Sequence, residues 1–176
     1  MKTDNGTVSI SIAGPPCSGK STMGKLLAIK LGLPFFDLDT RIEEVASMSI
    51  HSIFSRFGEE EFRRLESEAL DYILSTDGRI ILALGGGCLL KKDNLIAVRK
   101  KGIIITLAAS NDVLLKRREL QKDNRPLAMN DRAFIELLKS RNEHYNSLPN
   151  LIDTSDITPE ETVLEIIKIL GSGLIS

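Results

Sequence analysis

Hydrophobic positions along the chain alternate between two spacings, which favour strands and helices in turn. The run VSISIAG at 8–14 is rich in β-branched residues, and RIILALGGG at 79–87 is an apolar run that ends in three glycines. Short, nearly continuous apolar runs are typical of strands buried in a parallel sheet. The pattern predicts strands at 8–14, 33–39, 79–87, 103–110 and 150–154. It predicts helices between and after them, at 20–32, 41–57, 59–76, 94–102, 111–120, 132–147 and 158–170.

Several of the predicted helices carry residues that mark their ends. Gly58 interrupts the helical pattern between two of them, and Gly102 follows a third, as glycine often does at helix C-termini. The last helix begins with a capping box, Thr158 with Glu161, and has Pro159 in its first position. These signals support the helical segments independently of hydrophobic spacing.

Strands that alternate with helices predict an α/β fold in which one parallel sheet is covered on both faces. Ligands of such sheets bind at the carboxyl ends of the strands. Gly14, Asp37, Asp39 and the glycines 85–87 all fall at the ends of predicted strands. Because no linker, repeat or low-complexity segment interrupts the pattern, we expect a single domain over residues 1–176.

Composition excludes several classes of protein. The 23 basic and 24 acidic residues nearly cancel, which argues against nucleic-acid or membrane binding driven by bulk charge. The two cysteines, Cys17 and Cys88, are far apart in sequence and, with His51 and His144, show no metal-ligand spacing. We therefore expect neither a disulfide framework nor a structural zinc site, and a reducing compartment.

The N-terminal stretch MKTDNGT lacks the apolar segment of a signal peptide, and no apolar run in the chain is long enough to span a bilayer. We expect a cytoplasmic protein with no membrane partner.

The stretch GPPCSGKS, from Gly14 to Ser21, matches the phosphate-binding pattern G-x-x-x-x-G-K-[ST] between a predicted strand and a predicted helix. Gly14 and Gly19 allow the backbone N–H groups to turn toward phosphate oxygens, and the following helix adds its positive end. Lys20 would lie beside the β- and γ-phosphates, and the Ser21 hydroxyl could bind Mg²⁺. The residues expected to hold the nucleotide here are Gly14, Cys17, Ser18, Gly19, Lys20, Ser21 and Thr22. The alternative is a glycine-rich turn with a surface lysine.

Cys17 is the unusual member of this loop. A thiol near a lysine at a helix N-terminus could be reactive, whereas the simpler alternative is a small residue tolerated in the turn.

A phosphate-binding loop alone leaves several kinds of protein open. The chain is too short for most motors, and it lacks the N-K-x-D and D-x-x-G motifs of GTPase switches. A small-molecule kinase would need an aspartate near the metal, a polar substrate pocket and a cationic lid.

Asp37 and Asp39 lie two residues apart at the end of a predicted strand, so both would point to the same face if the strand continued. One could support Mg²⁺ through water and the other could bind a substrate hydroxyl. The alternative is that one of them caps the following helix near Arg41.

Arg63 lies four residues after Glu59 and three before Glu66, within a predicted helix. Two interpretations of Arg63 remain open. Its guanidinium could be oriented toward an anionic substrate, or it could form ion pairs on a solvated helix face. The helix carries an apolar stripe at helical spacing, formed by Phe62, Leu65, Ala69 and Tyr72.

Two further segments suit a kinase site. Gly85, Gly86 and Gly87 either allow a ligand to approach the backbone closely or form a structural turn. The basic, proline-interrupted stretch at 116–130 has the composition of a mobile lid, in which one of Arg118 and Arg125 would touch the base and the other the phosphates. A charge run of this kind can also be a solvated surface.

The ordered motifs of the chain closely resemble the shikimate kinase family, over nearly its whole length. They are G-x-x-x-x-G-K-S, D-x-D, G-E-x-x-F-R-x-x-E from Gly58 to Glu66, G-G-G, R-P-L at 125–127 and R-x-x-x-Y from Arg141 to Tyr145. The resemblance implies a three-layer α/β/α P-loop kinase fold with a five-stranded parallel sheet in the order 2-3-1-4-5. It also implies a substrate-binding helical region at about 40–76, and we expect a monomer.

The resemblance implies transfer of the γ-phosphate of ATP to the 3-hydroxyl of shikimate, with Mg²⁺. Lys20 and the lid residue Arg125 would contact the phosphates, and Asp39 would bind and orient the attacking hydroxyl. The other implied roles are metal binding by Ser21 and Asp37, substrate binding by Arg63, Gly85, Gly86, Gly87 and Arg141, and an adenine contact by Arg118.

The chain departs from the family pattern at Cys17, where glycine is usual, in the lid sequence RPLAM and in the segment NSLPN after Tyr145. The alternatives are a related kinase of gluconate or nucleoside monophosphates, or a nucleotide-binding module without catalysis. A neutral or phosphorylated acceptor would not need Asp39, Arg63, Gly86 and Arg141 together.

Overall fold

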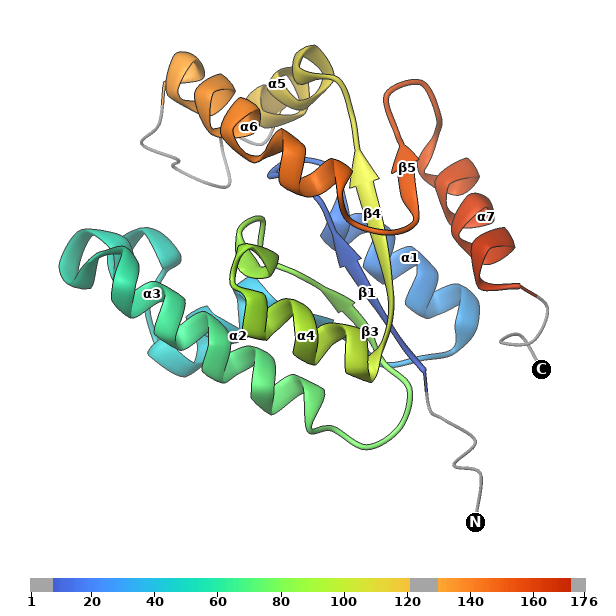
Figure 1. Cartoon of the computed structure of the whole chain (residues 1–176), viewed down its shortest axis with the longest axis horizontal. Coiled ribbons are helices and arrows are strands. Elements are labelled where there is room, and N and C mark those ends of the chain that lie inside the picture. The colour runs from blue at the N-terminus through green and yellow to red at the C-terminus, as the bar shows by residue number, and fades with distance from the viewer. Residues whose placement is uncertain (1–7, 121–129, 172–176) are drawn as a thin grey trace.

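Five parallel strands form the centre of the molecule (Figure 1). The computed structural model describes residues 8–120 and 130–171. The strands lie in the order β2-β3-β1-β4-β5, which confirms the predicted α/β fold and the sheet order implied by the family resemblance. Their bounds are Ser9–Ala13 (β1), Phe35–Asp37 (β2), Ile81–Ala83 (β3), Gly102–Ala108 (β4) and Leu151–Asp153 (β5).

Helices connect the strands and cover both faces of the sheet (Figure 1). Those before β3 are α1 (Lys20–Leu31), α2 (Leu38–Ala46) and α3 (Ile50–Leu74). Those after it are α4 (Lys92–Lys101), α5 (Asn111–Leu120), α6 (Asp131–Asn146) and α7 (Pro159–Leu170). A short 3-10 helix, Cys88–Leu90, follows the three glycines. The capping box of Thr158 and Glu161 forms as predicted.

The alternation of side chains along each strand builds two hydrophobic cores. Ile10 and Ile12 of β1 pack with α1 and α7 on one face of the sheet. Leu82 of β3 and Ile104 of β4 point to the other face, where α3 and α4 cover them. Successive strand residues point to opposite faces, so both faces of a covered sheet must be apolar. The central strands are accordingly buried, and the polar loops are left at their carboxyl ends.

The predicted strand at 33–39 is shorter than expected, and the geometry predicted for its two aspartates is wrong. The strand ends at Asp37, whose carboxylate accepts hydrogen bonds from the N–H groups of Asp39 (3.1 Å) and Thr40 (3.3 Å). This capping starts helix α2 at Leu38, so Asp39 lies in the first turn of a helix. The alternative considered for the sequence, an aspartate that caps the next helix, is confirmed for Asp37.

The predicted helix at 41–57 is two helices. Ser47 ends α2 in the left-handed conformation (φ 51°), and the Ser49 hydroxyl accepts from the N–H of Ser52 to begin α3. Gly58 marks a break as predicted, since its φ of 81° kinks α3. Tyr72 does not belong to the apolar stripe, because 60% of it is exposed. Among the described residues, no helix is long and apolar enough to cross a membrane.

Candidate active site

The phosphate-binding loop follows β1 at the carboxyl end of the sheet. Gly14 has a φ of 142°, and a Cβ there would lie 2.4 Å from the carbonyl oxygen of Leu107, so only glycine fits. Gly19 caps α1 with a φ of 94° and supplies no side-chain hydrogen bond to its first turn. The N–H groups at the positive end of α1 are therefore left for another acceptor, as anion binding requires.

Cys17 holds the loop against neighbouring helices. It adopts the left-handed conformation with a φ of 64°, which residues other than glycine seldom do. Its side chain packs against a small cluster of buried residues on α5 and α6, Leu114, Phe134 and Leu138. This contact gives the unusual cysteine a packing role.

Two polar contacts join the start of α1 to its surroundings. The Lys20 ammonium donates to the carbonyl of Pro15 at 2.9 Å, and the Ser21 hydroxyl donates to the Asp37 carboxylate at 2.5 Å. A hydroxyl beside a carboxylate, next to a phosphate-binding loop, matches the oxygen ligands that Mg²⁺ takes when phosphates and water complete its shell. Among the described residues, no group of three or more His, Cys, Asp or Glu side chains gathers to hold a metal.

Two carboxylates, those of Glu66 and Asp39, lie next to Gly85 on the same side. A Cβ on Gly85 would lie 2.8 Å from Oε1 of Glu66 and 2.9 Å from Oδ1 of Asp39. Glu66 is 1% exposed, and its Oε1 is buried without a hydrogen-bond partner in the described chain. Burial raises the pKa of Glu66; the guanidinium of Arg63 opposes this shift, and the charge of Asp39 adds to it. The site therefore holds a desolvated carboxylate close to the predicted catalytic aspartate.

Arg63 is fixed by two carboxylates of its own helix, as its spacing allowed. It donates to Glu66 at 2.8 Å and to Glu59 at 3.2 and 3.3 Å. Burial disfavours the charged form of Arg63, but the two carboxylates outweigh this effect and raise its pKa. Its Nη2 lies 2.7 Å from the position of a Cβ on Gly87. The guanidinium thus lies directly against the glycine loop.

Gly86 lies where three parts of the site meet. A Cβ on Gly86 would lie 3.2 Å from Pro16 of the phosphate-binding loop. The carbonyl oxygen of Gly86 accepts a hydrogen bond from the Tyr145 hydroxyl and a longer one, 3.4 Å, from the guanidinium of Arg141. Helix α6 therefore brings Arg141 to the glycine loop.

Arg118 and Arg125 complete the predicted set. Arg118 is buried on α5, where it pairs with Asp131 and lies over the ring of Phe134 at 4.9 Å. Both partners belong to α6, so Arg118 joins α6 to α5, whose residues 116–120 are the first part of the predicted lid. Arg125 lies outside the described residues, as do positions 121–129 of that lid.

Glu66 and Tyr145 have contacts that the sequence analysis did not anticipate. The signal for Glu66 was its place at helical spacing between Phe62 and Ala69, where an apolar residue would be expected on the buried face. Tyr145 lies four residues after Arg141, on the same face of α6. Both positions were part of sequence motifs, but motif spacing alone did not identify the approach of Glu66 to Gly85 or the bond from Tyr145 to Gly86.

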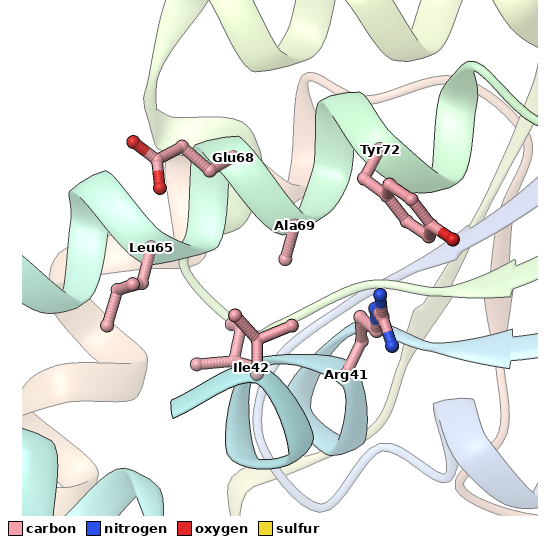
Figure 2. A pocket seen from close by; sticks show the side chains of 7 residues that line it. Arg41, Ile42, Leu65, Glu68, Ala69 and Tyr72 are labelled. Atoms are coloured by element: carbon pink, nitrogen blue, oxygen red, sulfur yellow. The ribbon is translucent and has the colours of Figure 1, made fainter. Parts of the chain in front are cut away.

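A separate hollow of about 260 Å³ lies between α2 and α3 (Figure 2). Arg41 lies over the ring of Tyr72 at one end of it, 4.5 Å from the ring centroid. The residues that line it are Arg41, Ile42, Val45, Leu65, Glu68, Ala69 and Tyr72. No predicted site residue is among them, so this hollow is distinct from the candidate active site.

Comparisons with known proteins show which family the chain resembles. A family model described as "Shikimate kinase" matches residues 16–171. The curated shikimate kinase of Thermodesulfovibrio yellowstonii is 39% identical over 163 residues, covering 91% of this chain and 93% of the relative. That of Geobacter sulfurreducens is 38% identical, covering 90% of this chain and 88% of the relative.

Solved structures extend the similarity to three dimensions. The shikimate kinase of Acinetobacter baumannii, solved in complex with shikimate, superposes with a TM-score of 0.85 at 29% identity and covers 96% of each chain. A gluconokinase from Sinorhizobium meliloti superposes with a TM-score of 0.63 at 16% identity, covering 92% of this chain and 90% of its own, which indicates a shared fold only.

Proposed function

The chain belongs to the shikimate kinase family, and we propose that it transfers the γ-phosphate of ATP to the 3-hydroxyl of shikimate. The products would be shikimate 3-phosphate and ADP, in the biosynthesis of chorismate and the aromatic amino acids. The observation that carries this proposal is the convergence of Asp39, Arg63 and Arg141 on one glycine loop, which itself contacts the phosphate-binding loop through Pro16.

The nucleotide side of the site is built by the start of α1. We assign the phosphates to the uncapped N–H groups of its first turn and to the Lys20 ammonium. Ser21 and Asp37, already in contact at 2.5 Å, would hold Mg²⁺, the serine directly and the aspartate through water. When bound, the ion neutralises charge on the β- and γ-phosphates. Arg118, fixed between Asp131 and Phe134, would border the adenine, and Arg125 would reach the phosphates.

The acceptor side recognises a hydroxylated carboxylate. Arg63 and Arg141 approach the glycine loop from α3 and α6, so a planar carboxylate between them would receive charge-assisted hydrogen bonds. Asp39 lies beside Gly85 and would accept a hydrogen bond from a ring hydroxyl. The N–H groups of Gly85, Gly86 and Gly87 would donate to the hydroxyls nearby.

The chemistry follows from this placement. Asp39 orients the 3-hydroxyl and receives its proton as the oxygen attacks the γ-phosphorus. The bond between that phosphorus and the β,γ-bridging oxygen breaks, and ADP leaves. In phosphoryl transfer most of the catalysis comes from positioning and from stabilising charge, which here fall to Lys20 and Arg125.

An acceptor assay separates this function from its alternatives. ADP release should be measured with ATP and Mg²⁺ in the presence of shikimate, gluconate or a nucleoside monophosphate. We expect release that depends on shikimate and is at background with the other two acceptors. A preference for gluconate or a nucleotide would overturn the proposal, and no acceptor-dependent release at all would favour a non-catalytic nucleotide-binding module.

A further inference from the structure

The carbonyl group of Gly86 is held from the side of α6. Its oxygen accepts a hydrogen bond from the hydroxyl of Tyr145, which is only 6% exposed. Arg141 contacts the same oxygen at 3.4 Å and lies one helical turn earlier. Burial raises the pKa of Tyr145, an effect that the charge of Arg141 opposes, so the hydroxyl keeps its proton at neutral pH and can donate.

Fixing this oxygen also fixes the next N–H group. The described residues contain no cis peptide bond, and in a trans peptide the carbonyl and the following N–H point in opposite directions. The hydrogen bond to Gly86 therefore sets the direction of the Gly87 N–H, away from Tyr145. Two adjacent glycines have little conformational preference of their own, so contacts from outside must select one orientation.

The predicted acceptor-binding groups surround this peptide. Arg63 lies against Gly87, and Asp39 lies against the preceding Gly85. Pro16 packs on Gly86 itself and limits its movement toward the phosphate-binding loop. Arg141 shares the Gly86 oxygen with Tyr145. The peptide between Gly86 and Gly87 thus lies among the predicted acceptor groups Asp39, Arg63 and Arg141.

We propose that Tyr145 is a positioning residue, whose hydroxyl holds the Gly86–Gly87 peptide so that the Gly87 N–H faces the acceptor. This inference rests on the proposed function, because the acceptor is taken to be shikimate. Tyr145 acts through the peptide and does not touch the reacting atoms. Helix α6 would then supply both a carboxylate-binding arginine and the residue that orders the loop.

The first test is Tyr145→Phe, which removes one hydroxyl and keeps the ring. Loss of a buried hydrogen bond typically changes an equilibrium by a factor of about 5 to 30, so KM for shikimate should rise by that factor. KM for ATP should change by less than about twofold. Tyr72→Phe is the matched control, because Tyr72 is the only other tyrosine and is 60% exposed; its constants should match the wild type.

A second measurement uses the wild-type protein and does not depend on how the variant folds. Gly85-Gly86-Gly87 contains the only adjacent glycines among the 13 in the chain. Labelling glycine with both ¹³C at the carbonyl and ¹⁵N leaves only the amides of Gly86 and Gly87 with a directly bonded ¹³C–¹⁵N pair. Shikimate should shift the amide resonance of Gly87, and in folded Tyr145→Phe both resonances should move or broaden without ligand.

The outcomes separate the inference from the function on which it rests. Suppose that the wild-type enzyme phosphorylates shikimate. If the KM values of Tyr145→Phe are then unchanged, or rise equally for ATP and shikimate, the role of Tyr145 alone is overturned. If saturating shikimate does not shift the Gly87 amide resonance of that active enzyme, the role of Tyr145 is also overturned. A wild-type enzyme that does not act on shikimate would overturn both.

Discussion

Replacing Glu66 with glutamine tests how the substrate-facing arginine is held. Arg63 contacts two carboxylates of its own helix that differ sharply in environment: the Glu66 side chain is 2% exposed and that of Glu59 is 66% exposed. Glu66→Gln removes the charge of the buried partner with little change in size. Glu59→Gln makes the same chemical change at the exposed partner and serves as the matched control.

The expected magnitude follows from the contact between Arg63 and Glu66. A hydrogen bond to a charged group contributes about 1.5–3 kcal/mol, and a neutral one about 0.5–1.5 kcal/mol. In Glu66→Gln the charged guanidinium still donates to the amide oxygen, so replacing the 2.8 Å bond to the carboxylate loses only part of its contribution, about 1.4 kcal/mol. A looser Arg63 should raise KM for shikimate about tenfold and leave KM for ATP unchanged. Glu59→Gln should alter neither by more than about threefold, because exposed ion pairs contribute about 0.2–1 kcal/mol.

Stability should respond differently from substrate binding. Glu66 is desolvated and one of its oxygens lacks a hydrogen-bond partner among the described residues, so removing its charge also removes part of an unfavourable burial. We expect the free energy of unfolding at pH 7 to change by less than about 1 kcal/mol, well below the 3–5 kcal/mol that a fully buried ion pair loses when one partner is removed.

The pH dependence has a definite sign. Because burial raises the pKa of Glu66 above 4.5, the folded protein binds the proton more readily than the unfolded chain. The contribution of Glu66 to the free energy of unfolding therefore falls as pH rises from about 4.5 through the folded pKa, and is constant above it. Glu66→Gln removes this dependence, so its stability relative to wild type should improve across that interval.

The assays are urea unfolding of both variants from pH 4.5 to 8, and steady-state kinetics with each substrate varied in turn. The reasoning fails if Glu59→Gln raises KM for shikimate as much as Glu66→Gln does. It also fails if the stability of Glu66→Gln relative to wild type declines with rising pH.

Three further substitutions test the rest of the site. Lys20→Ala should abolish phosphoryl transfer in the acceptor assay while urea unfolding shows a loss of only about 1.5–3 kcal/mol, the range for a hydrogen bond to a charged group such as the one from its ammonium to Pro15; sustained turnover would remove Lys20 from the mechanism. Asp39→Asn should lower kcat by about 10²–10⁴-fold, as expected for a positioned proton acceptor, and a wild-type kcat would contradict that role. Gly14→Ala should destabilise the fold by more than about 1–3 kcal/mol, since its Cβ would overlap the carbonyl of Leu107, and unchanged urea unfolding would refute the overlap.

Local spacing in the sequence predicted those parts of the site that lie within one element. Arg63 and its two carboxylates share a helix, so separations of four and three residues were enough to foresee both ion pairs. Gly14 and Lys20 could be predicted just as well, because the phosphate-binding loop is a continuous stretch whose glycines and lysine have fixed separations.

Residue spacing did not predict the structure of segments that suit both a strand and the start of a helix. The segment ending in Asp37 and Asp39 suits a strand, but the Asp37 carboxylate captures two N–H groups and starts a helix instead. The alternation of a strand therefore did not extend to Asp39. The carboxylate still reaches the site, since Asp39 lies beside Gly85 in the first turn of α2.

Contacts between segments far apart in the chain could not be predicted from the sequence either. The sequence of the loop alone did not explain why Pro16 and Cys17 occupy their positions. The fold shows that Pro16 packs on Gly86 and that Cys17 packs against the cluster on α5 and α6. The hydrogen bond from Tyr145 to Gly86 spans 59 residues. Such partners are set by the order of the strands, which brings these loops to one end of the sheet.

The most direct test of the central claim is the structure of the product. Purified protein, ATP, Mg²⁺ and shikimate should be incubated and followed by phosphorus and proton magnetic resonance. The account predicts one phosphate ester, on the 3-hydroxyl of shikimate, that forms in step with ADP. Phosphate on another hydroxyl, or ADP that forms equally fast without shikimate, would contradict it.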